Sequence, residues 1–398
     1  MATGDEPRPR RRLKTAQREG DKVTPLELFF DLVFVLAITQ CTALMAADPT
    51  WEGLAKGMLV LGVLWWAWVG YAWLTSVVDP EEGAVRIAIF AAMAALLVVS
   101  LCVPEAFGDL GLTFAVFYGF VRGGQLVLLL VAGRESPDMR RSVWVGLVPS
   151  TATGIGLLVA ASFADGTVQL ALWASALALD MLGPYLFGSA GWQLEPHHFA
   201  ERHGLIFIIA LGESIVAIGV GVEAGVDTGV IAATVLGTAL AATMWWAYFD
   251  VVALVAERRL IAAAVGREQN EIARDSYSLM HFPMIAGVVL IALGMKKTIA
   301  HVDQPLAPET AFALVGGLAV YLLAHVAFRY RNIHSINRQR LVLAVVLLAL
   351  VPLADEVDAL AALGGAALLM VGLITYEAIR FAEGRDKVRH ADGQAAPS

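Results

Sequence analysis

Two acidic residues lie inside apolar runs that are long enough to cross a bilayer. Asp31 belongs to the run at residues 29–38, and Glu213 to a similar run at residues 211–218 in the middle of the chain. Hydrocarbon strongly disfavours a carboxylate, so each acid needs a partner, an aqueous cavity or a proton. Gly212 beside Glu213 leaves room for water. This repeated placement is the strongest indication of function in the sequence.

Further ionisable residues could form a network with these acids. Asp31 lies one helical turn beyond Glu27, on the order of 10 Å below the membrane surface. Arg122 lies near the middle of a third apolar run, and Asp180 lies in another at a depth similar to that of Asp31. Two interpretations stay open: a buried arginine–carboxylate network with a structural role, or a proton relay or ion pathway.

The first apolar run opens with a helix-start signature. Thr24 suits the N-cap, Pro25 the first helical position, and Glu27 the third position after the cap. Together these residues predict a capping box, in which side chains satisfy the free amides of the first turn. Glu27 therefore has a structural role that does not require Asp31.

Composition places the chain among membrane proteins. Of 398 residues, 58% are hydrophobic and 16% are charged, whereas soluble domains carry about 25% charged residues. Apolar stretches recur along nearly the whole chain, which predicts an all-α polytopic membrane protein. Twelve spans are predicted, at residues 24–46, 53–74, 84–103, 111–132, 142–163, 167–187, 203–222, 229–250, 276–295, 309–328, 340–354 and 359–380.

The basic residues predict the orientation of these spans. Most of the 28 Lys and Arg residues fall in the N-terminal tail and the even-numbered loops, Arg202 among them, whereas Lys56, Lys296 and Lys297 lie near the opposite side. The positive-inside rule then places both termini in the cytoplasm and requires an even number of spans. The arginines at residues 8–12 fit a topology anchor better than a nucleic-acid site, so no nucleic-acid partner is expected.

The second half of the chain repeats features of the first. Residues 65–67 near the end of span 2 read Trp-Trp-Ala, as do residues 245–247 near the end of span 8, and these tryptophans are expected to pack between helices. The order of such matches suggests duplication of a six-helix unit into parallel halves, which typically place a transport pathway at their interface. The predicted organisation is a basic tail at 1–23, repeats at 24–198 and 199–382, and a second tail at 383–398.

Signals for catalysis and metal binding are weak. His197, His198, His203 and His281 map to the cytoplasmic side, but their spacing fits no standard metal-ligand pattern. With Glu201 they are the only candidate catalytic cluster. The sequence contains no phosphate-binding glycine loop, nucleophile elbow or zinc-protease helix. We therefore expect no cofactor, no bound metal and no enzymatic activity.

Two segments resemble the bacterial low temperature requirement A (LtrA) family. The first comprises residues 24–34 with 37–40, and the second residues 201–205 with 211–215, within a likeness that extends from about residue 22 to 382. The motif residues include Phe29, Phe30, Glu201, Arg202, His203 and Gly212. The resemblance implies a bacterial inner-membrane protein linked to growth in the cold. It implies no particular molecular activity.

A more distant resemblance bears on mechanism. Residues 29–39 are similar to the Phe-Ser-Asp signature of the FSD-motif potassium channels, whose two-repeat members contain parallel six-helix units. The resemblance implies that spans 1 and 7 line a pore, with Leu36 and Ile218 as hydrophobic constrictions and Asp31 in a helix-packing network. Phe30 stands in place of the motif serine, and the second copy reads Gly-Glu at residues 212–213, so potassium selectivity is not implied.

These observations predict a channel or transporter for an ion or small solute, with spans 1 and 7 beside the path. In a proton-coupled variant, Asp31 or Glu213 would change protonation during the cycle. The alternative is a non-transporting membrane protein: a lipid-active enzyme, or a sensor or scaffold in cold adaptation. The expected partners are the lipid bilayer and a small ion or solute. The oligomeric state is left open.

Overall fold

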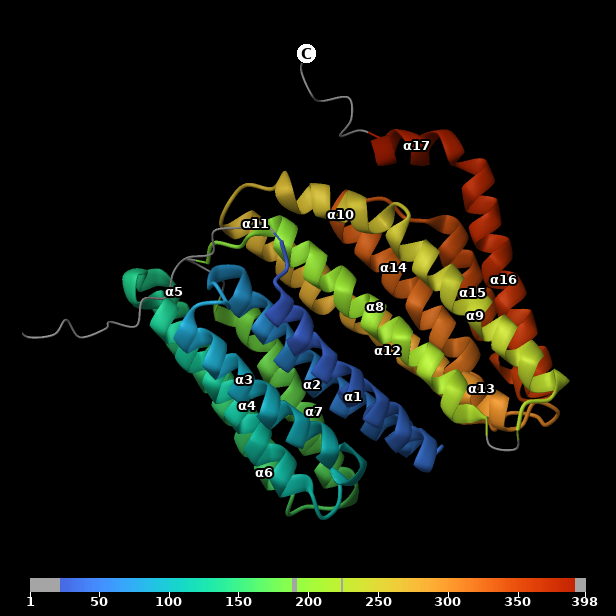
Figure 1. The fold of residues 1–398 in the computed structure, drawn as a ribbon, viewed down its shortest axis with the longest axis horizontal. Coiled ribbons are helices and arrows are strands. Elements are labelled where there is room, and N and C mark those ends of the chain that lie inside the picture. The colour runs from blue at the N-terminus through green and yellow to red at the C-terminus, as the bar shows by residue number, and fades with distance from the viewer. Residues whose placement is uncertain (1–21, 188–191, 223–224, 391–398) are drawn as a thin grey trace, which may run out of the picture.

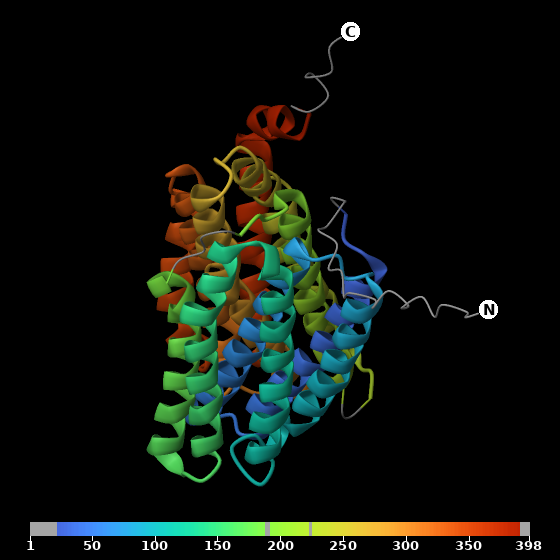
Figure 2. The same cartoon turned by 90° about the vertical axis from the view of Figure 1, so that its left-hand side faces the viewer.

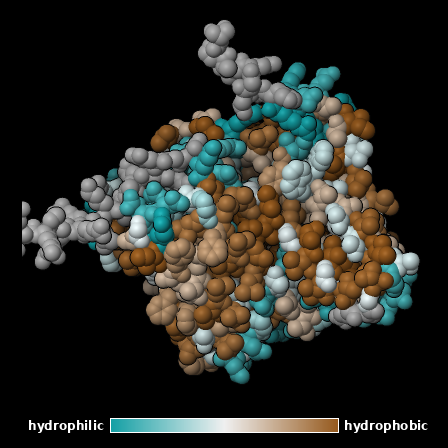
Figure 3. Space-filling model, viewed as in Figure 1, coloured by the Kyte–Doolittle hydropathy of each residue, from teal (hydrophilic) through white to brown (hydrophobic). Residues whose placement is uncertain are grey.

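The protein is an all-α polytopic membrane protein. The computed structural model describes residues 22–187, 192–222 and 225–390, and the described residues contain no β-strand. Eleven of their helices are long and apolar enough to cross a membrane. Figure 3 shows a broad hydrophobic band across the middle of one face, with hydrophilic residues at both ends of the bundle, so the middle of the protein contacts lipid.

The first half of the molecule ends at residue 187. Its elements are α1 (Pro25–Ala47), α2 (Trp51–Val77), α3 (Gly83–Cys102), η1 (Val103–Glu105), α4 (Gly111–Ala132), η2 (Gly133–Glu135), α5 (Pro137–Ser142), η3 (Val143–Leu147), α6 (Val148–Ala161) and α7 (Gly166–Phe187). The segment η3 is a π-helical turn that joins α5 to α6 without a break, and the two together are long enough for one span.

The second half begins with α8. Its elements are α8 (Pro196–Gly221), α9 (Thr228–Phe249), α10 (Val252–Ile261), α11 (Arg267–Ile272), η4 (Ala273–Leu279), α12 (His281–Ala300), α13 (Pro308–Ala311), η5 (Phe312–Gly316), α14 (Gly317–Ile333), α15 (Arg338–Ala354), α16 (Ala359–Arg380) and α17 (Ala382–His390). The short helix α17 turns away from α16 and lies at the end of the bundle where α1 begins (Figure 1).

The seventh and eleventh predicted spans differ from the observed helices, the seventh in where it begins and the eleventh in its length. The seventh begins at Pro196 instead of residue 203, so Arg202, which we expected in a loop, lies inside α8 and is fully buried. Its ion pairs with acids of α1 offset the cost of that burial. The eleventh corresponds to α15, which has 17 residues and a length of about 26 Å, slightly less than the hydrocarbon core. Twelve spans therefore remain a prediction.

The helices of the two halves pack in the same order. In the first half α1 contacts α2 and α3, α4 contacts α3 and α6, and α7 contacts α6 and α2. In the second half α8 contacts α9 and α12, α14 contacts α12 and α15, and α16 contacts α15 and α9. This correspondence matches the order of the sequence matches. The duplication itself stays a prediction.

The tryptophan pairs differ between the halves. Trp65 and Trp66 are buried, as expected, but Trp245 and Trp246 are 46% and 41% exposed. The expectation that both pairs pack between helices was wrong for the second. The reason is position: α2 packs against helices of both halves, whereas α9 packs mainly within its own half.

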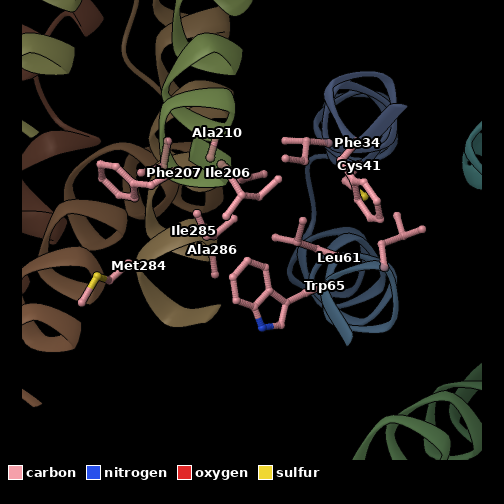
Figure 4. Close-up of a cluster of buried hydrophobic side chains, with 14 of the residues drawn as sticks. Phe34, Cys41, Leu61, Trp65, Ile206, Phe207, Ala210, Met284, Ile285 and Ala286 are labelled. Atoms are coloured by element: carbon pink, nitrogen blue, oxygen red, sulfur yellow. The ribbon is translucent and has the colours of Figure 1, made fainter. Parts of the chain in front are cut away.

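The halves meet where α1 and α2 pack against α8 and α12, which we call the half interface (Figures 1 and 2). Figure 4 shows its apolar part, where Leu61 and Trp65 of α2 face Ile206 of α8 and Ile285 of α12. Lipid tails are as apolar as these side chains, so close van der Waals packing between the helices, not removal from water, holds the halves together here.

Candidate functional site

The start of α1 confirms the predicted helix cap. Thr24 accepts a hydrogen bond from the backbone amide of Glu27, and a Glu27 carboxylate oxygen accepts one from the Thr24 amide at 2.9 Å. The other oxygen of Glu27 lies 2.8 Å from Nε2 of His198 on α8. Because the imidazole faces a carboxylate, Nε2 carries the hydrogen and donates. Glu27, a member of the capping box, therefore also joins the two halves.

Asp31 is paired with Arg202 of α8, not with Arg122 as the sequence suggested. Its Oδ1 accepts hydrogen bonds from Nη2 of Arg202 at 2.5 Å and from the indole nitrogen of Trp68 at 2.8 Å. Both Asp31 and Arg202 are completely buried. The two sequence segments that carry the family motifs thus meet at one place in the half interface.

Arg202 is shared between two acids. Its Nη1 donates to Thr75 Oγ1 at 2.8 Å and lies 3.7 Å from a carboxylate oxygen of Glu27. Within the described residues, Oδ2 of Asp31 and Nε of Arg202 have no hydrogen-bond partner. We call Glu27, Asp31, His198 and Arg202 the interface ion cluster. It is buried but incompletely hydrogen-bonded.

A second polar contact joins α1 and α8 deeper in the bundle. Thr39 donates a hydrogen bond of 2.5 Å to Glu213, whose residue is 3% exposed. Thr39 follows Asp31 by eight positions, or about 12 Å along the helix. Both contacts advance in the same direction along both helices, so α1 and α8 run parallel. A Cβ atom built on Gly212 meets no atom within 4 Å, so space is open on the helix surface at Gly212, the residue before Glu213.

Apolar side chains separate the two polar contacts. Phe34 and Ile38 of α1 and Ile206 and Ala210 of α8 are all buried between them. Together they form an apolar layer between the interface ion cluster and Glu213. The residues expected at a constriction lie elsewhere along the helices.

Leu36 is half-buried, and Ile218 lies beyond Glu213. The side chain of Ile218 packs beside Gly237 of α9. The constriction formed by Leu36 and Ile218 therefore stays a prediction.

Arg122 and Asp180 form a separate cluster within the first half. Nη2 of Arg122 on α4 contacts both carboxylate oxygens of Asp180 on α7, at 2.8 and 2.9 Å. Thr151 of α6 donates to the same carboxylate at 2.9 Å, and Arg122 also donates to Gln125 at 2.6 Å. The single network of Asp31, Asp180 and Arg122 that we considered is therefore two clusters, because the three residues lie on helices that face different neighbours.

A line of buried histidines and tyrosines extends from the half interface into the second half. The rings of His203 and His281 lie 5.2 Å apart, and the Tyr248 hydroxyl lies 2.8 Å from Nε2 of His281. The rings of Tyr248 and His325 are 6.1 Å apart, and Nη1 of Arg340 donates to Nδ1 of His325 at 2.9 Å. The sequence missed this line because its members lie on five helices, and no spacing along the chain relates them.

The π-helical segment η4 helps to position this line. The backbone carbonyl of Ser276 accepts a hydrogen bond from Nδ1 of His281 at 3.0 Å. Ser278 accepts hydrogen bonds from two indole nitrogens of α2, those of Trp65 and Trp73. A π-helical turn leaves carbonyls available for such contacts, and π-bulges are frequent at functional sites. Here η4 connects the first half to the histidine line.

Of the residues considered for catalysis, His203 and His281 lie side by side, and the others contact different neighbours. His197 contacts Glu257, His198 contacts Glu27, and Nδ1 of His203 donates to the backbone carbonyl of Phe199 at 2.8 Å. Glu201 accepts a hydrogen bond from the amide of Val23 at 3.0 Å. Glu201, His197, His198 and His203 thus hydrogen-bond to four different segments or turns.

Comparison with known proteins gives the family. The model of the bacterial low temperature requirement A protein (LtrA) matches residues 22–375. This chain belongs to the LtrA family. An uncharacterised protein of Rhizobium meliloti (strain 1021) is 28% identical over 389 residues, which cover 92% of each chain. No solved structure matches the chain. In this LtrA protein the matched region includes both motif segments and all residues of the interface ion cluster.

Proposed function

We propose that this LtrA protein moves protons, alone or coupled to a small ion or solute, across the bacterial inner membrane along the contact between α1 and α8. The observation that supports the proposal most directly is the buried pair of Asp31 and Arg202. It joins the two halves at the place where parallel repeats typically form a pathway. Ionisable residues within a membrane are costly, and by default they indicate function.

The hydrogen bonding of Asp31 suits a group that changes partner. One of its oxygens accepts two hydrogen bonds while the other accepts none from the described residues. A buried polar atom without a partner costs about 1–3 kcal/mol, and a conformation that supplies a proton or water to Oδ2 of Asp31 would recover that cost. Arg202 can remain neutralised during such a change because Glu27 lies 3.7 Å away.

The apolar layer formed by Phe34, Ile38, Ile206 and Ala210 would act as the barrier. Narrow hydrophobic segments close a pathway by excluding water, and here the layer separates the interface ion cluster from Glu213. Transport would then require the halves to move relative to each other, which would expose the two polar contacts to opposite sides in turn. Glu213, with open space beside Gly212, would receive the proton beyond the barrier.

Flux into proteoliposomes tests the proposal. The purified protein, reconstituted with a pH-sensitive dye inside the vesicles, should acidify or alkalinise the lumen faster than empty vesicles when a proton gradient is applied. A panel of cations and small solutes would identify a coupled species. Asp31→Asn and Glu213→Gln should each reduce the flux at least tenfold, which corresponds to about 1.4 kcal/mol in the barrier.

Asp180→Asn is the matched control, because Asp180 is also a buried member of an arginine pair but lies within one half. Flux should persist in this variant once the amount of folded protein is matched. If the wild type shows no flux of protons or of any tested species, transport is excluded. A sensor or scaffold role would then be favoured by the burial of both acids.

A further inference from the structure

A cavity of about 530 Å³ lies within the second half, away from the half interface. Its walls come from the end of α9, from α10, α14, α15 and α16, and from α17, which lies across the end of the bundle (Figure 1). The volume is within the range of about 300–1,000 Å³ that is typical of small-molecule sites. The proposed transport pathway does not use this cavity.

The charged lining of the cavity is unbalanced. It contains four arginines and two acids. Arg340 is held by Glu377 through two hydrogen bonds at 3.0 and 2.9 Å, and Arg385 contacts Asp250. Both acids are thereby neutralised, and an excess of positive charge remains.

The remaining two arginines supply that excess. Among the described residues, Arg329 and Arg338 contact no carboxylate, and Nε of Arg329 has no hydrogen-bond partner. Guanidinium groups in such a position bind phosphate or carboxylate oxygens, often through two parallel hydrogen bonds.

His325 lies in the lining beside Arg340. Its Nδ1 lies 2.9 Å from Nη1 of Arg340. A guanidinium nitrogen can only donate, so Nδ1 must accept and the hydrogen of the neutral ring lies on Nε2. This Nε2 is buried and has no partner among the described residues, although His325 lines the cavity.

The apolar lining indicates the source of such a ligand. Ile333, Ile336 and Phe381 line the cavity, and 36%, 52% and 43% of their respective surfaces are exposed. Trp246, also in the lining, is 41% exposed. Exposed apolar side chains beside arginines are characteristic of the membrane interface, where basic pockets between helices bind anionic lipid head groups.

We propose that this cavity binds the phosphate head group of an anionic phospholipid, with Arg329 and Arg338 on the phosphate and an acyl chain beside Ile336 and Phe381. The helix α17 would close the cavity from the end of the bundle. It is held there by Arg385 and Arg389, which contact Asp250, and by a hydrogen bond of 2.6 Å from Arg258 to the backbone carbonyl of Val388.

Thermal unfolding of the full-length protein in detergent tests the proposal. Dioleoylphosphatidylglycerol should raise the melting temperature by on the order of 3 °C more than dioleoylphosphatidylcholine, because only a bound ligand stabilises the folded state by mass action. The double variant Arg329→Gln, Arg338→Gln should lose this difference. Arg267→Gln, which removes a highly exposed arginine outside the cavity, should keep it.

Two further arms make the result decisive. Gln339→Glu adds a carboxylate to the lining without removing any buried group, so it should weaken retention of phosphatidylglycerol in native mass spectrometry even if the double variant folds poorly. Inorganic phosphate replaces the lipid in the second arm. Equal stabilisation by free phosphate, equal stabilisation by both lipids, or unchanged retention in Gln339→Glu would each overturn the proposal.

Discussion

The molecule contains two buried arginine–aspartate pairs that differ in how completely they are hydrogen-bonded. In the first half, both oxygens of Asp180 are occupied, by Arg122, Thr151 and, at 3.4 Å, Tyr118. At the half interface, Oδ2 of Asp31 has no partner among the described residues, and its arginine is shared with a second acid. Both pairs are buried, and the less completely hydrogen-bonded pair is the more deeply buried one, so exposure to solvent does not explain the difference.

The difference separates structure from function. A buried ion pair is costly to assemble, and it stabilises a fold only when further hydrogen bonds satisfy its remaining atoms. In the cluster of Arg122, which connects three helices of one half, both carboxylate oxygens meet that condition, although Nε of Arg122 has no partner among the described residues. In the interface ion cluster, Oδ2 of Asp31 does not meet that condition. This cluster lies at the half interface. We infer that the first cluster fixes a packing arrangement and the second is able to change.

The largest effect should follow from removing each arginine. Arg202→Gln leaves two buried carboxylates, Glu27 and Asp31, and should lower the free energy of unfolding by on the order of 5 kcal/mol. Arg122→Gln leaves one carboxylate with two neutral donors and should cost about 3 kcal/mol. Melting temperatures of both variants in the same detergent show which variant loses more stability. Equal losses, or a larger loss in Arg122→Gln, would contradict the comparison of the two pairs.

The aspartates should show the opposite order. Asp180→Asn leaves Arg122 with no acid in contact among the described residues and should cost about 3 kcal/mol. After Asp31→Asn, Arg202 retains Glu27 at 3.7 Å, so we expect a loss of about 1–2 kcal/mol. Unfolding by sodium dodecyl sulfate in mixed micelles measures both values. A larger loss for Asp31→Asn would show that Glu27 does not compensate Arg202.

Replacing a glycine by alanine beside each cluster should test the comparison of the two clusters with smaller losses of stability. A Cβ atom at Gly70 would lie 2.4 Å from Gln125 and 2.6 Å from Arg122, so Gly70→Ala should destabilise the first-half cluster by about 2 kcal/mol. At Gly212 the same change meets no atom within 4 Å and should be neutral or slightly stabilising. Thermal unfolding tests stability, and proton flux of Gly212→Ala tests whether the open space at Gly212 is needed.

The smallest effect is expected at the helix cap. Thr24→Ala removes the side-chain half of the capping box and should cost about 1 kcal/mol. Proton flux per folded molecule should be unchanged, because Glu27 keeps its contact with His198. Thr24→Ser is the matched control and should restore stability. Loss of flux in Thr24→Ala at full stability would assign the cap a role in transport.

The sequence indicated the residues of the interface ion cluster but not which of them contact each other. The motif at residues 24–34 and the motif beginning at residue 201 were singled out separately, and Asp31 was expected to find a cation. That cation is Arg202, which the sequence placed in a loop because a charged residue so near a predicted span end is usually solvated. His281 was noted only as a weak metal or catalytic candidate and His325 gave no signal, since a lone histidine in an apolar helix carries no spacing pattern.

The sequence by itself determined the all-α membrane fold, the helix cap at Thr24 and the burial of acids in apolar runs, because hydropathy, capping and the cost of charge in hydrocarbon act locally. Only the tertiary structure decided which cation pairs with which acid. It also decided that α2 packs against helices of both halves, whereas α9 packs mainly within its own half. Those outcomes depend on how helices from distant parts of the chain pack, and packing depends on shape and contact in three dimensions, which no local pattern of residues encodes.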